Sequence, residues 1–308
     1  MAVFTTFEKS ALERYLRIYD IGELYSFNAI STGIENSNYF VTLGNDGDIT
    51  EFVLTITEEL SFEDVPFFND LMGRLNKQGL PVPNAQKTLD GMSSAIFCGK
   101  PTWLFSKLEG SHPVLINSQH CLAIGQNLAK LHNSAREAKY QRSNPYASEW
   151  MLDAINKVRH RIDLRDLSNI QNLAAQYVAL EKNRALPKGI IHGDLFTDNA
   201  LFVGDELSGI IDFYHACNDF LIQDIAVTIN DWCKTTSGEI DETLKRCLIA
   251  GYQSVRMLSV DEENHLPLFQ QIAALRFSLT RLLSGSEEAP LKDPREFLNI
   301  LRKLMDTN

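Results

Sequence analysis

Apolar residues follow two different spacings along the chain, and the change comes near residue 107. Before it, short runs with strand-like alternation are separated by turns rich in Gly, Asn and Asp. This spacing predicts strands over residues 25–30, 38–43, 51–57, 95–98 and 102–106. It also predicts one main helix over residues 62–78, which ends at Gly79. A shorter helix would begin earlier, at the capping-box pair Thr5 and Glu8.

After residues 107–113, which resemble a linker, the spacing becomes mostly helical. A first helix carries Cys121, Leu128 and His132 on one face, so His132 is expected to be a core residue. Further helices are expected over residues 145–161, 168–183, 224–234, 240–255, 267–283 and 294–305. A β-rich interruption is expected over residues 189–191, 200–203 and 209–213, the last two as a hairpin.

The predicted fold class is therefore α+β, with two lobes of the kind seen in protein kinases. Residues 1–107 would form a small antiparallel-sheet lobe with one main helix. Residues 108–308 would form a larger, mostly helical lobe with an embedded β-hairpin. A crevice between lobes is a preferred place for a ligand.

The composition narrows the class of protein. The 308 residues exceed what a single hydrophobic core usually holds, and 44% of them are hydrophobic, which fits a globular chain with two lobes. The net charge of −11 comes without a dense basic patch, so nucleic acid is not expected as a partner. We expect no membrane association, because no apolar run could span a bilayer and no signal peptide is evident. The five cysteines contain no Cys-x-x-Cys pair, which favours a cytoplasmic location.

The densest polar cluster lies in the β-rich interruption. Asp194 and Asn199 are five residues apart in the segment His-Gly-Asp-Leu-Phe-Thr-Asp-Asn, and Asp212 follows a buried apolar run. Phosphoryl transfer requires a carboxylate that orients the acceptor, together with an amide oxygen and a second carboxylate for Mg²⁺. The cluster matches this requirement if its three side chains converge.

The same residues resemble the catalytic parts of the protein-kinase-like fold. Residues 192–199 resemble its catalytic loop, and the dipeptide at 212–213 resembles its metal-binding motif. The resemblance implies that Asp194 is the catalytic base and that Asn199 and Asp212 hold Mg²⁺ beside bound ATP.

The form His-Gly-Asp is similar to the aminoglycoside phosphotransferase and choline kinase group, because Gly193 stands where protein kinases carry Arg. The Asp-Ile-Ala element at Asp224 is similar to that group as well, which implies that His192 and Asp224 support the loop. No Ala-Pro-Glu follows Asp212, and the segment from there to Asp224 is too short to dock a peptide. A small-molecule acceptor is therefore expected.

The nucleotide side departs from the common kinase pattern. Thr55 occupies the strand position where most kinases carry a phosphate-binding Lys. No Gly-rich loop is present, but Gly33, Asn36, Ser37 and Asn38 could bind phosphates through backbone N–H groups and polar side chains. These residues and Thr55 are the predicted nucleotide contacts.

With these departures, the sequence resembles the homoserine kinases that are built on the aminoglycoside-phosphotransferase fold. That family is similar in tolerating Thr at the strand position. The resemblance extends over residues 33–41, 52–56, 66–72, 79–83, 192–202, 209–219 and 226–233. It implies transfer of the ATP γ-phosphoryl group to L-homoserine in threonine biosynthesis, by a monomer or homodimer.

Such an acceptor has a carboxylate, an ammonium and a primary hydroxyl, and each would need a partner. Arg276 and Arg281 lie among apolar residues and are the candidates for the carboxylate. Asp231 is the candidate for the ammonium, with Trp232 beside it as a wall of the site.

Three other functions stay open on the sequence alone. A kinase of the same fold could act on an aminoglycoside, on choline or ethanolamine, or on a sugar. A metal phosphohydrolase could use His192, Asp194, Asp212 and His215, although it would need a two-metal carboxylate cluster. A nucleotide-binding pseudokinase is suggested by Thr55.

Overall fold

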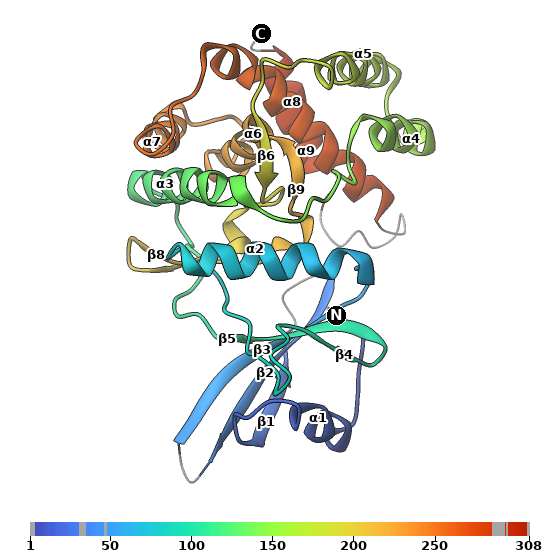
Figure 1. The fold of residues 1–308 in the computed structure, drawn as a ribbon. Helices are drawn as coiled ribbons and strands as arrows, with labels where there is room; N and C mark the ends of the chain where they lie inside the picture. Colours follow the sequence, from blue (N-terminus) through green and yellow to red (C-terminus); the bar gives the residue numbers. More distant parts are fainter. Residues whose placement is uncertain (1–3, 31–34, 46–47, 285–292, 294, 307–308) are drawn as a thin grey trace. The chain divides into compact units, whose positions relative to one another are not determined.

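The computed structural model describes residues 4–30, 35–45, 48–284, 293 and 295–306, which belong to two compact units. The N-terminal unit comprises Met1–Gly110, Glu137–Tyr140 and Ser208–Tyr214, and the C-terminal unit comprises Ser111–Arg136, Gln141–Leu207 and His215–Asn308. Figure 1 labels the helices and strands of both units. Within the described ranges, no helix is both long enough and apolar enough to cross a membrane.

The N-terminal unit is built on a five-stranded antiparallel sheet with strand order β1-β2-β3-β5-β4. Its strands are β1 (Glu23–Ala29), β2 (Asn36–Asn45), β3 (Asp48–Thr57), β4 (Ala95–Phe97) and β5 (Lys100–Ser106). Its helices are α1 (Lys9–Leu16) and α2 (Val65–Lys77), the latter preceded by the 3₁₀ turn η1 (Phe62–Asp64). The five predicted strands and the predicted main helix are confirmed.

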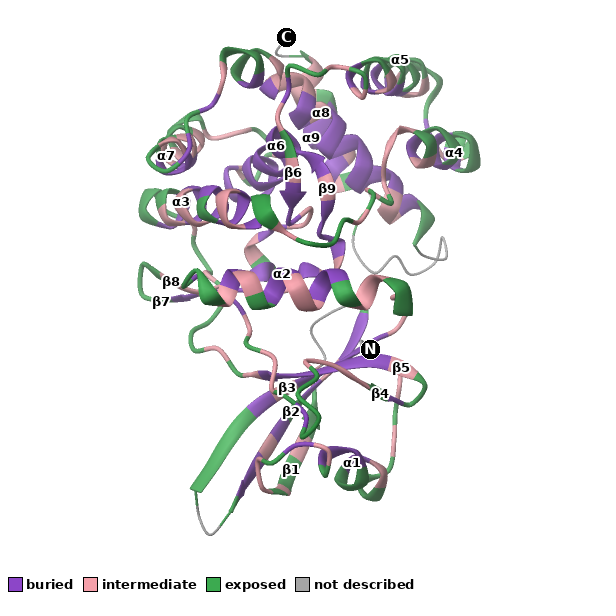
Figure 2. Ribbon diagram, in the orientation of Figure 1, coloured by how far each residue is buried: buried purple, intermediate pink, exposed green. Residues whose placement is uncertain are grey.

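One face of this sheet carries the core of the unit. Tyr39, Val41 and Leu43 on β2 are buried together with Leu54 and Ile56 on β3, and the apolar side of α1 belongs to the same cluster. Figure 2 shows these buried stretches along the strands. Because side chains alternate between faces of a strand, Asn38 and Thr55 lie on the opposite face, where the β2–β3 register pairs them directly.

The capping-box prediction for α1 is wrong. The helix begins at Lys9, and no side chain caps its N-terminus at Glu8. The Thr5 hydroxyl instead donates a hydrogen bond of 2.8 Å to Glu58 Oε1, just beyond β3. The local spacing could not predict this, because the carboxylate that binds the Thr5 hydroxyl lies 53 residues further along the chain.

The C-terminal unit is mostly helical, as predicted. Its helices are α3 (Ser118–Ser134), α4 (Ser148–Val158), α5 (Leu164–Leu180), α6 (Leu221–Trp232), α7 (Glu242–Gln253), α8 (Val260–Leu283) and α9 (Arg295–Asp306). Its short 3₁₀ turns are η2 (Ala135–Glu137), η3 (Arg159–Arg161) and η4 (Thr197–Asn199), and η5 (Phe213–His215) lies at the division between the units. Helix α6 is buried along its whole length (Figure 2), so this helix forms the centre of the unit.

Two small sheets accompany these helices. Strand β6 (Lys188–Ile191) pairs antiparallel with β9 (Cys217–Phe220), and β7 (Ala200–Val203) forms a two-stranded sheet with β8 (Glu206–Ile210). The predicted embedded hairpin is therefore present as β7–β8. The strand β9 is not predicted, because its sequence Cys-Asn-Asp-Phe lacks an apolar alternation.

Two predicted boundaries in this part of the chain are wrong. The strand expected over residues 209–213 ends at Ile210, and Asp212 has a φ of +62°, which a strand cannot continue. The helix expected from residue 267 begins at Val260, where Ser259 and Glu262 form a capping box. Pro267 consequently lies inside α8 rather than at its start.

Helices α3 and α7 approach each other closely because each carries a glycine at the contact. A Cβ atom on Gly125 would lie 2.0 Å from the backbone oxygen of Leu248, and one on Gly251 would lie 2.2 Å from that of Leu122. No side chain larger than hydrogen fits at either position. The close contact matters for the site, because α3 carries His132 and α7 carries Tyr252, which hydrogen-bond to each other.

Candidate active site

The predicted catalytic loop joins β6 to β7 in the C-terminal unit. The Asp194 carboxylate accepts a hydrogen bond of 3.0 Å at Oδ2 from Asn199 Nδ2, which also donates to the Asp194 backbone oxygen at 2.7 Å. Since the same nitrogen faces two oxygen atoms, the orientation of the Asn199 amide is determined. Its oxygen Oδ1 is not used in these bonds and is the atom that a metal ion could bind. The structure thus brings the predicted base and one predicted metal ligand together.

A buried carboxylate on α6 holds the start of the loop. Asp224 is fully buried and accepts the backbone N–H of His192 at 2.7 Å and that of Gly193 at 2.9 Å. Burial by itself raises the pKa of Asp224, but the hydrogen bond and charge of His132 and the N–H donors outweigh it, so that the net pKa is lowered. The carboxylate therefore stays ionised and fixes the backbone that precedes Asp194.

The support for Asp224 extends through three further elements. His132 on α3 donates a hydrogen bond of 3.1 Å from Nε2 to the Asp224 carboxylate, and its Nδ1 lies 2.7 Å from the Tyr252 hydroxyl on α7. The Arg256 guanidinium binds Tyr252 at 3.1 Å and Glu262 of α8 at 3.0 Å. The prediction that His132 is a satisfied core residue is confirmed.

Sequence analysis missed Tyr252, Arg256 and Glu262 as parts of the site's support. The Ser-x-x-Glu spacing at the start of α8 could have drawn attention to Glu262. Nothing local to Tyr252 or Arg256 indicates that they reach a residue beneath the catalytic loop.

Gly193 has a conformational reason to be glycine. Its φ of +78° is unfavourable for residues with a side chain, and a Cβ atom there would lie 2.8 Å from the backbone oxygen of His215. Nδ1 of His192, in turn, accepts the Asp194 backbone N–H at 3.3 Å. The loop therefore has no room for the Arg that protein kinases carry at position 193.

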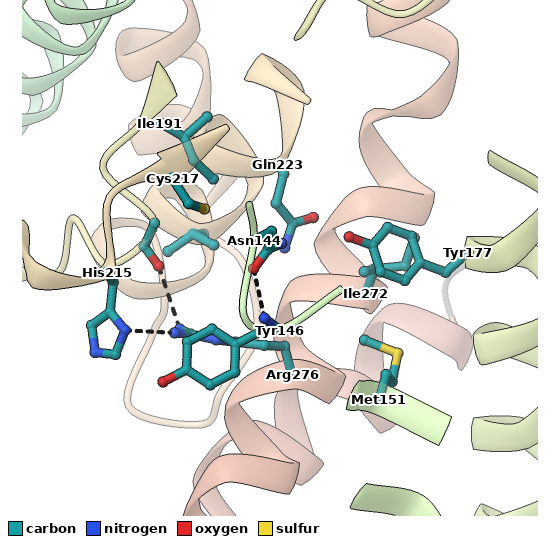
Figure 3. Close-up of a pocket in the computed structure, with 12 residues that line it drawn as sticks. Asn144, Tyr146, Met151, Tyr177, Ile191, His215, Cys217, Gln223, Ile272 and Arg276 are labelled. Atoms are coloured by element: carbon teal, nitrogen blue, oxygen red, sulfur yellow. Dashed lines mark hydrogen bonds between the residues drawn. The ribbon is translucent and has the colours of Figure 1, made fainter. Parts of the chain in front are cut away.

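Arg276 reaches this loop from α8. Its guanidinium lies 3.9 Å from Asp194 Oδ1, 3.4 Å from the Gly193 backbone oxygen and 3.3 Å from His215 Nδ1. Figure 3 shows Arg276 with His215 and Tyr146 in the wall of a pocket of the C-terminal unit. Of the four acceptor-binding candidates, this is the one with a charged group directly beside the predicted catalytic base.

The same pocket is also lined by Asn144, Tyr177 and Gln223. Asn144 donates a hydrogen bond of 2.6 Å to Asp219, whose carboxylate lies behind the wall. Burial raises the pKa of Asp219 to about 6, although the Phe220 N–H and Asn144 partly offset the effect. The wall of the pocket therefore contains several polar groups.

The remaining acceptor-binding candidates have partners inside the fold. Asp231 accepts the Thr197 backbone N–H and pairs with Lys234, each at 2.7 Å, and Trp232 donates to the Leu195 backbone oxygen at 3.0 Å. The guanidinium of Arg281 binds Glu296 of α9 at 2.6 Å. These contacts anchor the loop and join α8 to α9.

The N-terminal unit contains the predicted nucleotide residues, except for Gly33, which lies outside the described residues. The Thr55 hydroxyl donates to Asn38 Oδ1 at 2.7 Å and also hydrogen-bonds Tyr214. Burial and the nearby Asp212 carboxylate raise the pKa of Tyr214, so its hydroxyl stays protonated. The two departures from the common kinase motifs, Thr55 and Tyr214, therefore contact each other.

Asn36 and Ser37 have contacts of a different kind. The Ser37 hydroxyl is fully buried, donates to Glu58 and accepts the backbone N–H groups of Phe4 and Thr5 at 2.9 Å each. Asn36 Oδ1 accepts the backbone N–H of Glu58 at 3.3 Å. Both side chains tie the start of β2 to neighbouring segments of the unit.

The two predicted metal ligands belong to different units. Asn199 lies in the C-terminal unit with Asp194, whereas Asp212 lies in the N-terminal unit. The convergence of these three side chains stays a prediction. Among the residues that the structure describes, no group of three or more His, Cys, Asp or Glu is arranged to hold a metal ion.

The chain is similar to known proteins over most of its length. Residues 26–258 match the model of the phosphotransferase enzyme family, APH. The homoserine kinase of Pseudomonas aeruginosa is 38% identical over 302 residues, which cover 96% of this chain and 94% of the relative. The homoserine kinase of Neisseria meningitidis serogroup B is 36% identical over 311 residues and covers 99% and 100%.

Among solved structures, the amicoumacin kinase hAmiN, in complex with AMP-PNP, Ca²⁺ and Ami, superposes with a TM-score of 0.75. The match covers 98% of this chain and 94% of that one at 16% identity, which shows that the fold is shared. The predicted fold class is confirmed. The order of motifs, the arrangement of the loop and the full-length similarity agree, and the chain belongs to the phosphotransferase enzyme family.

Proposed function

We propose that this chain transfers the γ-phosphoryl group of ATP to the hydroxyl of L-homoserine, giving O-phospho-L-homoserine for threonine biosynthesis. The observation that carries the proposal is the similarity to homoserine kinases over nearly the whole of both chains, 38% for the Pseudomonas aeruginosa relative. The proposal also fits the predicted catalytic loop, in which a hydrogen bond from Asn199 holds the Asp194 carboxylate. The free thiols of all five cysteines and the use of ATP suit a cytoplasmic enzyme.

Asp194 is the proposed catalytic base. Asn199 occupies its Oδ2, and Oδ1 would accept the hydrogen bond of the homoserine hydroxyl. The carboxylate thereby orients the hydroxyl oxygen for attack in line with the γ-phosphorus of ATP. It takes up the hydroxyl proton as the new O–P bond forms and the bond from the γ-phosphorus to the oxygen of the leaving ADP breaks. The backbone hydrogen bonds to Asp224 hold this carboxylate in place before the acceptor arrives.

Asn199 and Asp212 are the proposed ligands of Mg²⁺. Carboxylate and amide oxygens suit this hard cation, and the Asn199 amide is oriented with its nitrogen on Asp194, which leaves the oxygen for a metal. Bound there with ATP, the metal ion would neutralise negative charge on the phosphates.

The nucleotide would contact the N-terminal unit. We propose that Asn38 and Thr55 face the phosphates, since both lie on the sheet face opposite the core. Asn36 and Ser37 would act mainly by fixing the start of β2, and Gly33 by its backbone. No residue of this set is cationic, so the metal ion would provide most of the positive charge.

Release of ADP, measured with and without L-homoserine, tests the proposal. We expect homoserine to stimulate ADP release and to be converted to its O-phosphate, with choline and an aminoglycoside as parallel acceptors. Preference for either of those acceptors would replace homoserine by the alternative kinase function. No turnover of ATP with any acceptor would favour the pseudokinase alternative.

A further inference from the structure

Arg276 differs from Arg256 and Arg281, two other arginines of the C-terminal unit whose side chains are little exposed. Its side chain is 7% exposed, yet its nearest carboxylate, Asp194, is 3.9 Å away. Arg256 and Arg281 instead bind glutamates at 3.0 Å and 2.6 Å. A buried charge is costly unless close hydrogen bonds compensate it, so a guanidinium without a close carboxylate indicates an additional anionic partner.

The hydrogen bonds that Arg276 makes within the fold are long. Its contacts with the Gly193 oxygen and His215 Nδ1 measure 3.4 Å and 3.3 Å. Bonds between a guanidinium and a carboxylate are typically about 2.7–2.9 Å. The N–H groups of Arg276 therefore lie near the Gly193 oxygen and His215 but make only long hydrogen bonds to them.

Aromatic rings fix the plane of this guanidinium. Its central carbon lies 4.1 Å from the ring centre of Tyr146 and 3.8 Å from that of Phe277. Cation–π contacts of this kind compensate part of the burial cost, and Figure 3 shows the Tyr146 ring beside Arg276.

The pocket beside Arg276 suits one small polar group. Its free space is about 20 Å³, which admits a group about the size of a water molecule and not a sugar ring. Within the described part of the chain, the buried Oε1 of Gln223 in the same wall has no hydrogen-bond partner. The space therefore admits one polar group of a ligand, and Arg276 is the residue in its wall that would attract an anion.

We infer that Arg276 binds the carboxylate of the acceptor and so selects an amino acid over an amino alcohol. The inference rests on the proposed function, because it assumes homoserine as acceptor. Three carbon atoms separate the carboxylate carbon of homoserine from its hydroxyl oxygen. One end of the molecule can therefore contact Arg276 while the other reaches Asp194 Oδ1, 3.9 Å from the guanidinium.

The test compares two acceptors that differ in the carboxylate alone. The acceptors are L-homoserine and its analogue without the carboxylate, 3-amino-1-propanol (below, aminopropanol). Each is assayed with the wild type, Arg276→Gln, Arg276→Lys and Arg281→Gln. We expect Arg276→Gln to lower kcat/KM for homoserine about 10- to 100-fold, mainly through KM, as removal of a charged hydrogen-bond partner does. Its kcat/KM for aminopropanol should fall much less, so that the preference for homoserine over aminopropanol is reduced.

The other two variants serve as controls. Arg276→Lys keeps the charge without the fork and should recover part of the preference for homoserine. Arg281→Gln removes a guanidinium from the same helix and should leave the ratio of the two acceptors unchanged, since its partner is Glu296. Homoserine should also raise the Tm of the wild type and not that of Arg276→Gln, which reports binding without turnover.

Two outcomes would overturn the inference in distinguishable ways. Equal loss of activity on both acceptors in Arg276→Gln, with KM unchanged, would assign the residue to the transferring phosphoryl group or to the loop. That result would leave the proposed function intact. A wild-type enzyme that does not phosphorylate homoserine would overturn the proposed function and this inference together.

Discussion

Each unit contains a set of hydrogen-bonded polar residues at its predicted functional positions, and the two sets differ in charge. In the N-terminal unit, Asn38, Thr55 and Tyr214 form a neutral hydrogen-bonded set at the strand position where most kinases carry a cation. In the C-terminal unit, the loop at Asp194 is surrounded by buried charges, with Asp224 beneath it and Arg276 beside it.

This difference has a physical consequence for the architecture. The neutral set is satisfied by single hydrogen bonds among Asn38, Thr55 and Tyr214, whereas a buried charge needs several donors or acceptors at once. The C-terminal unit provides them from α3, α6, α7 and α8. We therefore expect substitutions around the loop to have larger effects than substitutions in the neutral set.

The largest effect is expected for Asp194→Asn. The amide cannot take up the acceptor proton, so kcat should fall about 10²- to 10⁴-fold while ATP binding persists. Steady-state kinetics and nucleotide titration measure the two properties. Asp198→Asn changes an exposed residue of the same loop and should retain activity. Near-normal turnover by Asp194→Asn would remove the residue from the catalytic role.

Asp224→Asn should lower the stability of the protein strongly. Each buried donor that loses a charged acceptor typically costs about 1–3 kcal/mol, and the amide can replace only one carboxylate oxygen for His132 and the two backbone N–H groups. Urea unfolding at neutral pH measures the loss. Asp153→Asn, which removes an exposed pair with Lys157, should cost no more than about 1 kcal/mol.

The same variant has a pH signature. The folded pKa of Asp224 is lowered, so its contribution to stability is present above the unfolded value of 3.8 and is lost as the pH falls through the folded value. The stability difference between wild type and Asp224→Asn should therefore shrink in acid. A difference that grows toward low pH would contradict the ionised state of Asp224.

The smallest effect is expected in the neutral set, as a coupling between positions 55 and 214. Thr55→Lys alone would place an ammonium against the Tyr214 hydroxyl and should destabilise the N-terminal unit. Tyr214→Gly removes the hydroxyl and opens space for the lysine. The free energy of unfolding of the double variant should therefore exceed the value expected from adding the two single effects by about 0.5–3 kcal/mol. Urea unfolding of the four proteins gives the coupling, and simple additivity would show that the two positions are independent.

Local patterns determined much of this molecule. The strands of the N-terminal sheet follow from alternation and turn residues, and the main helix α2 from its period and the Gly79 stop. The pairing of Asp194 with Asn199 could be predicted because the two residues are five apart in one tight loop. Such features depend on interactions between near neighbours, which a sequence displays directly.

The tertiary structure alone decided which distant groups meet. Asp224 hydrogen-bonds His132, 92 residues away, and Arg276 hydrogen-bonds the Gly193 backbone, 83 residues away. Thr5 hydrogen-bonds Glu58 instead of capping α1 as expected. Periodicity carries no information about such pairs, because it tells which face a side chain occupies and not which element packs against that face. For the same reason Arg276 and Arg281 look equivalent in the sequence, and only the packing of α8 places one beside the catalytic loop and the other against α9.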